Sequence, residues 1–183
     1  LTGVYFDTTI TGQLHQRSGG TNTTGAISNA NAYLTPSYLF FDFTSTGAWF
    51  SVEGYTRPFL RMEWTPVVSN AHELQMLSSK LGSNNAFSYK LANDINLATS
   101  LTNKSEMWKD NSASVDYSNY KGSWVPIGNS ALFSGDFDGQ NHTIDNLYIK
   151  RHVQNSNSSK LGLFGHIAGS SSDHSVIENL TLN

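Results

Sequence analysis

The stretch Ser123–Ile149, SWVPIGNSALFSGDFDGQNHTIDNLYI, decides the expected fold because its last seven residues return later in the chain. The first copy of this phrase is Thr143-Ile-Asp-Asn-Leu-Tyr-Ile149, and the second, 33 residues later, is Val176-Ile-Glu-Asn-Leu-Thr-Leu182. After its first residue, each copy has the order apolar, acidic, Asn, Leu, polar, apolar. A short strand that recurs is typical of proteins whose successive coils stack and present the same inward face.

The two copies predict which side chains stack. Leu147 and Ile149 are expected to point inward and to lie on Leu180 and Leu182, with the Asp-Asn pair of the first copy forming a bend. Stacked coils pair their strands about 4.8 Å apart, and a coil of this kind uses roughly 20–25 residues. The pattern therefore predicts an all-β chain, a parallel β-helix or β-solenoid, with one short helix and loop excursions.

Glycine and aspartate mark the predicted corners of these coils. Gly128, Gly135 and the pair Asp138-Gly139 separate short apolar runs, and Gly takes a positive φ at the least cost. His142 opens the recurring phrase and is expected to be hydrogen-bonded or stacked at a corner. We interpret these five residues as a structural turn motif.

Composition excludes several classes of protein. Only 14% of the 183 residues are charged and the formal net charge is −3, which is too weak and of the wrong sign for nucleic-acid binding. The chain has no cysteine, so disulfides, thiolate metal sites and a cysteine nucleophile are excluded. No apolar run approaches the ~18 residues of a membrane span. Much of the rest is Ser, Asn, Thr and Gly, as in long extracellular β proteins.

The chain divides into two blocks, Leu1–Trp64, which is rich in aromatic residues, and Thr65–Asn183, which carries the recurring phrase. Two polar stretches in the second block, Thr99–Lys121 and Lys150–Lys160, are predicted to be loops. We expect the chain to be a segment of a longer protein.

One amphipathic helix is predicted at about residues 71–81. Asn70 can cap its first turn, with Glu73 completing a capping box, and Leu74, Leu77 and Leu81 fall on one face. This helix is expected to cover an open end or side of the core.

Several phrases together resemble the repeat region of filamentous-haemagglutinin-like bacterial adhesins of two-partner secretion, which carry GLUG-type repeats. They are Trp124-Val-Pro-Ile-Gly128, Phe133-Ser-Gly-Asp-Phe-Asp-Gly139, His142-Thr-Ile-Asp-Asn-Leu147, Gly162-Leu-Phe-Gly165, Tyr5-Phe-Asp-Thr-Thr-Ile-Thr-Gly-Gln13 and Gly54-Tyr-Thr-Arg-Pro-Phe-Leu-Arg61. The resemblance implies a right-handed parallel β-helix in a secreted adhesin or surface filament. Residues 1–64 would then end one repeat array and residues 65–183 would start the next. The chain departs from the family by lacking reiterated Gly-Gly-Leu-Val-Gly units.

Acidic residues gather at Asp136, Asp138 and Asp145. Three interpretations are open: a carboxylate site like that of β-helical polysaccharide lyases and hydrolases, a calcium site, and tight turns. We favour turns, because Asp136-x-Asp138 offers only two close ligands where Ca²⁺ takes six to eight oxygens. The six histidines form no helical ligand pair, so no catalytic residue, metal ligand or cofactor is predicted.

Aromatic residues concentrate in the first block and have two interpretations. They form either a surface that binds sugars or proteins, or the filling of the core, which we favour. The residues concerned are Tyr5, Phe6, Tyr38, Phe40, Phe41, Phe43, Trp49, Phe50 and Tyr55.

Three of the five N-x-[ST] sequons, at Asn22, Asn103 and Asn157, fall in predicted loops and are candidate glycosylation sites. The resemblance permits such modification.

The expected function is a non-enzymatic structural or adhesive segment of a secreted protein at the bacterial cell surface. Its expected partners are neighbouring repeats or copies of itself, together with a host glycan or surface receptor bound through exposed loops. The alternative is a carbohydrate-active β-helix enzyme, a polysaccharide lyase or hydrolase.

Overall fold

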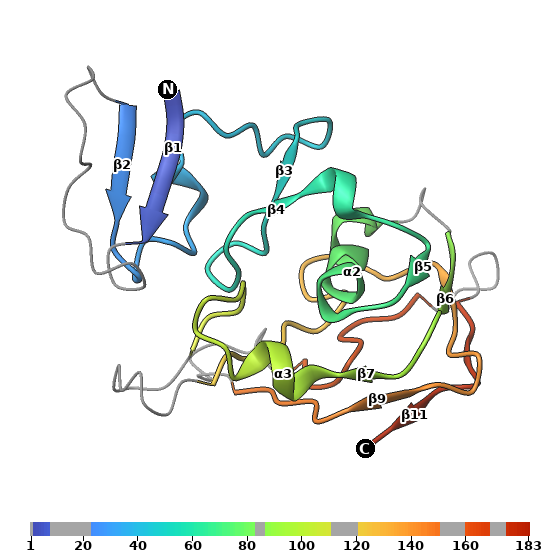
Figure 1. Ribbon diagram of the computed structural model, residues 1–183. Coiled ribbons are helices and arrows are strands. Elements are labelled where there is room, and N and C mark those ends of the chain that lie inside the picture. Colours follow the sequence, from blue (N-terminus) through green and yellow to red (C-terminus); the bar gives the residue numbers. More distant parts are fainter. Residues whose placement is uncertain (1, 8–22, 83–86, 111–120, 151–159, 169–174) are drawn as a thin grey trace.

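The computed structural model describes residues 2–7, 23–82, 87–110, 121–150, 160–168 and 175–183 (Figure 1). The strands in these ranges are β1 (Thr2–Asp7), β2 (Thr23–Ile27), β3 (Trp49–Phe50), β4 (Phe59–Leu60), β5 (Val67–Val68), β6 (Ser88–Leu91), β7 (Ile95–Asn96), β8 (Asp136–Asp138), β9 (Thr143–Asp145), β10 (Ile177–Glu178) and β11 (Thr181–Leu182). The helices are α2 (Ala71–Met76) and α3 (Leu97–Leu101), with 3₁₀ turns η1 (Thr35–Ser37), η2 (Arg61–Glu63) and η3 (Leu77–Lys80).

Two small parallel sheets organise the second half of the chain. One has the order β10-β8-β6-β5 and the other the order β11-β9-β7. In Figure 1, β7, β9 and β11 lie side by side below α2. Two parallel bridges, Ile127 with Phe164 and Phe133 with Ile167, continue the pairing outside the named strands. Segments far apart in sequence therefore stack in the same direction.

The two copies of the recurring phrase pair out of register, because the end of the second copy, Thr181-Leu182, lies opposite the start of the first, Thr143-Ile144. Leu182 lies opposite Ile144, and Ile177 lies opposite Phe137, so the prediction that the second copy stacks on Leu147 and Ile149 is wrong. The copies do share a local conformation, because Asn146 and Asn179 both take a left-handed φ, of 60° and 51°. The phrase thus encodes a strand that ends in an Asn corner, and each copy is used at a different corner.

The predicted fold class, an all-β right-handed parallel β-helix, is wrong. The sheets are small and mixed: β3 and β4 pair in antiparallel fashion, and two α-helices, α2 and α3, contribute to the core. The parallel strands of the two sheets in the second half of the chain are two to four residues long. Paired residues such as Val68 and Leu91, Tyr89 and Phe137, or Phe137 and Ile177 are 23, 48 and 40 positions apart. Equal coils of about 20–25 residues would require a constant separation.

The main core lies between the parallel strands and the helices. Along β6, Tyr89 and Leu91 are buried while Ser88 and Lys90 are exposed, which is the period-two pattern of a half-buried strand. Phe137 and Ile144 continue this apolar surface on the next strands. Burial of such side chains contributes about 1.5–3 kcal/mol each.

The helix predicted at 71–81 is shorter than expected. It is α-helical from Ala71 to Met76 and narrows to the 3₁₀ turn Leu77–Lys80. Its start follows the sequence signal: the Asn70 side chain accepts a hydrogen bond from the Glu73 amide, and the Glu73 carboxylate accepts one from the Ser69 amide.

The predicted loop Thr99–Lys121 contains ordered core elements. Helix α3 covers Leu97–Leu101, capped by the Asn96 side chain, with Leu97 and Leu101 buried one turn apart. Trp108 is only 1% exposed and stacks on Trp124 with ring centroids 5.9 Å apart. Residues 151–159 of the other predicted loop lie outside the described part of the chain.

The first block contributes to two clusters of apolar residues. Strands β1 and β2 pair in parallel beside a small cluster formed by Ile27, Ala32, Tyr33 and Tyr38. Phe59, from β4, is buried, and other residues of this block, including Val52, Tyr55 and Trp64, pack against the main core. A domain boundary at residue 64 stays a prediction. Among the described helices, none is long and apolar enough to cross a membrane.

A buried amide joins α2 to the rest of the core. Gln75 is 0% exposed; its Nε2 donates to the Val125 carbonyl at 3.0 Å and to Ser78 Oγ at 3.2 Å. Its Oε1 accepts from Trp108 Nε1 at 2.8 Å and from the Val125 amide at 3.4 Å. Both ends of the amide are therefore used.

Replacing Gln75 with Leu should lower the free energy of unfolding by about 2–4 kcal/mol, because buried groups lose their partners while the side-chain volume is nearly kept. Ser78→Ala, which removes only one contact of this amide, should cost about 0.5–1 kcal/mol. Urea unfolding followed by circular dichroism measures both. Equal stability of Gln75→Leu and the wild type would contradict the bridging role.

Candidate functional site: an aromatic cavity beside an anchored arginine

The predicted corner glycines lie where the chain passes close to itself. Gly128 has φ of +88°, and a Cβ there would lie 2.5 Å from the His166 carbonyl oxygen. A Cβ on Gly135 would lie 2.5 Å from the Phe87 carbonyl oxygen, and one on Gly139 would lie 2.4 Å from that of Asn179. A side chain at any of these three positions would collide with neighbouring backbone, which gives the glycines a structural role.

The acidic residues of the same stretch accept hydrogen bonds within the fold. Asp138 Oδ1 accepts from the Asn179 side chain and the Gln140 amide, and these bonds lower the pKa of Asp138. Asp136 Oδ1 accepts from the amide of Val176. The carboxylate of Asp145 accepts from the side chain of the last residue, Asn183, at 3.0 Å.

His142 takes part in a similar corner. Its Nδ1 lies 3.1 Å from Asp94 Oδ1, which also accepts from the Thr143 amide. The Thr143 bond, followed by the contact with His142, lowers the pKa of Asp94. The five residues of the predicted turn motif therefore lie at strand ends and corners.

The sequence-predicted aromatic block builds a cavity of about 210 Å³. Ile27, Ala32 and Tyr38 form its buried floor. The rim is half-buried, so the cavity opens to the surface, and it is formed by Tyr5, Phe41, Trp49, Arg57, Pro58 and Met107. Floor and rim come from segments that lie up to about 100 residues apart in the chain.

Ring stacking fixes the shape of this cavity. The rings of Phe41 and Trp49 are parallel within 5°, with centroids 3.9 Å apart, and the Tyr38 ring stacks on Phe41 with centroids 5.2 Å apart. Tyr5 packs edge-on against both Tyr38 and Phe41. Such pairs are worth about 0.5–1.5 kcal/mol beyond burial. The cavity is therefore preformed.

A tight turn at Asp42 brings the stacked rings together. The Asp42 carboxylate accepts hydrogen bonds from the Thr44 amide and hydroxyl, and these bonds lower the pKa of Asp42. The backbone carbonyl of Asp42 accepts a hydrogen bond from the Trp49 amide. A Cβ on Gly47 would lie 2.3 Å from that carbonyl oxygen, so only glycine fits there. The neighbouring Phe40 does not belong to the cavity lining, and 56% of its surface is exposed.

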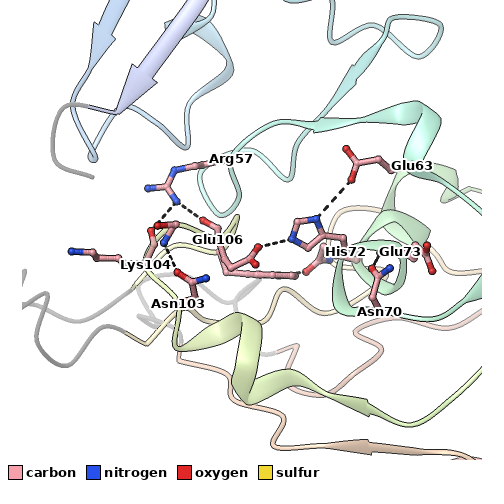
Figure 2. A network of polar contacts seen from close by, with 11 residues as sticks. Arg57, Glu63, Asn70, His72, Glu73, Asn103, Lys104 and Glu106 are labelled. Atoms are coloured by element: carbon pink, nitrogen blue, oxygen red, sulfur yellow. Dashed lines mark hydrogen bonds and ion pairs between the residues drawn. The ribbon is translucent and has the colours of Figure 1, made fainter. Parts of the chain in front are cut away.

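Arg57 is anchored at the rim by the segment that follows α3. Its guanidinium donates to the carbonyl oxygens of Lys104 and Glu106, as Figure 2 shows, and to Asn29 Oδ1 at 3.2 Å. It also lies 5.0 Å from the centre of the Tyr33 ring. A planar guanidinium with several acceptors is rigidly placed.

His72 bridges two carboxylates beside this anchor. Its Nε2 lies 2.6 Å from Glu106 and its Nδ1 lies 3.7 Å from Glu63 (Figure 2). The ring packs edge-on against Phe59 and Trp108. Both ring nitrogens of His72 face carboxylates, so this side chain connects η2, α2 and the segment after α3. The arrangement favours a structural role for the imidazole.

Within the described residues, no group of three histidine, aspartate or glutamate side chains is arranged to hold a metal ion. Of the candidate glycosylation sites, Asn103 is exposed, and its Oδ1 accepts from the Ser105 amide in a turn after α3. Asn22 and Asn157 lie outside the described residues.

No sequence pattern indicated that Arg57, Met107 and His72 lie near one another. Arg57 belongs to the phrase Gly54–Arg61, which was interpreted only as a resemblance to the adhesin family, and Met107 lies in a predicted loop. The aromatic residues were visible in the sequence; the structure buries Tyr38 in a cluster and places Trp49 in the lining of the cavity.

In comparisons with known proteins, no protein-family model, curated protein or solved structure matches the chain. The site has to be interpreted from its own chemistry.

The lowered pKa values of Asp94 and Asp138 predict acid sensitivity. A carboxylate whose pKa is lower in the folded protein than its ordinary pKa of 3.8 stabilises the folded state at pH values above 3.8. This stabilisation is lost as the pH falls through the lower pKa of the folded state. The melting temperature of the wild type should therefore fall more steeply below pH 3.8 than that of the double variant Asp94→Asn, Asp138→Asn.

Calorimetry over a pH series measures this difference, with Ser130→Ala as an exposed control that should follow the wild-type curve. Identical acid dependence in wild type and double variant would show that these carboxylates do not contribute.

Proposed function

We propose that this chain is a non-enzymatic adhesive module of a secreted bacterial surface protein, and that it binds its target through the aromatic cavity. The observation that carries the proposal is a preformed cavity with a buried floor and an open aromatic rim. Rigid aromatic rings at an opening are the groups that anchor protein interfaces and ligands.

The use of the acidic residues supports binding without turnover. Asp136, Asp138 and Asp145 accept hydrogen bonds from backbone amides and from Asn side chains at strand corners. A lyase or hydrolase of the alternative class would need carboxylates directed at a substrate.

The extracellular location rests on composition and on the resemblance to two-partner-secretion adhesins. Cysteine is absent, and Ser, Asn, Thr and Gly supply much of the chain. The proposed location is therefore independent of what the cavity binds.

The adhesive role predicts that Trp49→Ala weakens attachment of chain-coated beads to cultured epithelial cells about tenfold, which corresponds to ~1.4 kcal/mol. The loss has a physical cause, since half of the Phe41–Trp49 stack at the rim is removed. Phe40→Ala is the matched control, because it removes an exposed aromatic side chain next to the cavity, and attachment should stay unchanged. Unfolding curves of both variants are the control for correct folding.

A second measurement addresses the enzyme alternative. Incubation with acidic and neutral polysaccharides should release no new reducing ends and no unsaturated products. Turnover that Asp136→Ala or Asp138→Ala abolishes would overturn the non-enzymatic assignment. Wild-type beads that fail to attach to any surface tested would overturn the adhesive assignment.

A further inference from the structure

We propose that a second cavity, separate from the aromatic one, binds a single neutral sugar ring. This cavity holds about 240 Å³, and three segments line it: residues 50–53, the 3₁₀ turn η3 with the residue after it, and the turn at residues 129–130. None of its lining residues belongs to the lining of the aromatic cavity. The inference therefore goes beyond the proposed adhesive function and does not depend on it.

The size and the apolar wall of this second cavity suit one ring. Pockets for drug-sized ligands occupy about 300–1,000 Å³, so a volume of about 240 Å³ limits the ligand to a smaller molecule. Phe50, Val52 and Leu81 form the apolar part of the lining. An aromatic side chain offers a broad apolar contact surface, against which the C–H groups of a sugar ring can pack.

Hydroxyl groups form the polar part of the lining, from Ser51, Ser78 and Ser130. Ser51 Oγ is buried and has no hydrogen-bond partner among the described residues. Because this residue as a whole is only half-buried, rotation of χ1 to another staggered position can direct the hydroxyl to a ligand. Ser78 Oγ accepts from Gln75 Nε2 at 3.2 Å, and no acceptor among the described residues takes its own hydrogen. These hydroxyls match a ligand that itself carries several.

Glu53 supplies a strong acceptor to the cavity. Its side chain is exposed, and Oε2 accepts from the Thr35 amide at 3.0 Å. A carboxylate has about four lone-pair sites, so acceptor capacity remains for the hydroxyls of a sugar. Hydrogen bonds to a charged acceptor are roughly twice as strong as neutral ones. Glu53 is the one carboxylate among the described lining residues, whereas glycoside hydrolysis uses a pair, so we expect binding without cleavage.

Charges of both signs surround the cavity, which favours a neutral ligand. Opposite Glu53, Lys160 Nζ donates to a carbonyl of the lining turn at 3.0 Å. The Arg61 guanidinium, itself near Asp42, lies 5.4 Å from the centre of the Phe50 ring. A net charge on the ligand would therefore meet both attraction and repulsion. A purely apolar ligand would cover the hydroxyls and the carboxylate without pairing them, at about 1–3 kcal/mol for each group.

The methyl glycosides of glucose, galactose and mannose are the probes for this site. In assigned ¹H–¹⁵N spectra, at least one of them at millimolar concentration should shift the amide signals of Ser51, Ser78 and Ser130. The signals of Phe41 and Met107, in the aromatic cavity, should stay in place. For the sugar that binds, the analogues with a carboxylate at C6 or an amine at C2 should bind no more tightly than the neutral form. Cyclohexanol, a ring with one hydroxyl, should leave the signals unchanged.

Two variants separate the contacts. Glu53→Gln can still accept from the Thr35 amide but loses the charge, so affinity for the neutral glycoside should fall about tenfold. Ser51→Ala removes a hydroxyl that has no partner among the described residues, so the melting temperature should not fall, while affinity should drop about threefold. Glu178→Gln, an exposed glutamate outside the lining, is the matched control and should bind like the wild type.

Unmoved amide signals with all three neutral glycosides would overturn the sugar site. Tighter binding of the carboxylate or the amine analogue would overturn the choice of a neutral ligand, and a response to cyclohexanol would overturn the role of the hydroxyls. Wild-type affinity in both Glu53→Gln and Ser51→Ala would overturn the assigned contacts. These outcomes differ from failure of the adhesive function, which shows as polysaccharide turnover or as absent attachment.

Discussion

The buried amide of Gln75 is the interaction on which much of the second block depends. It is hydrogen-bonded to Trp108 and to both backbone groups of Val125, so it joins α2, the segment after α3 and the stacked strands at one point. Apolar contacts among these segments are extensive but do not specify their relative positions. An amide with both ends satisfied has directional requirements, and it therefore fixes how the helix lies on the core.

The position of Trp108 carries this constraint outward. Its ring packs on Trp124 inside the core and edge-on against His72, whose nitrogens face Glu106 and Glu63. The carbonyl of Glu106 in turn anchors Arg57 at the rim of the aromatic cavity. A chain of contacts thus leads from the core to the proposed binding site, and the cavity depends on correct folding of the segment after α3, which also supplies Met107 to its rim.

Local features of this protein were predictable from sequence, and distant pairings were not. The cap at Asn70, the bend at Asn146 and the close-packed Gly139 follow from residue chemistry within a few positions. Helix α3 was missed because five residues give too little periodicity, although Asn96 before Leu97 and Leu101 is a signal that could have found it. The predicted β-helix was wrong because equivalent positions of the two similar phrases were assumed to stack, whereas the copies pair out of register. Only the aromatic part of the cavity lining was predictable from the sequence, because Arg57 and Met107 join it through tertiary contacts.

The different corners occupied by the two phrase copies have a consequence for how such a chain can change. Each strand and its Asn corner form a self-contained unit, while the segments between paired strands differ in length by more than twofold. The entropy of closing a loop rises slowly with its length, by about 0.6 kcal/mol for each doubling. Insertions and deletions between corners therefore cost little free energy compared with that of the strand contacts, which they leave intact. A lineage of such proteins can diversify by exchanging whole connecting segments, with little selection against a change in length.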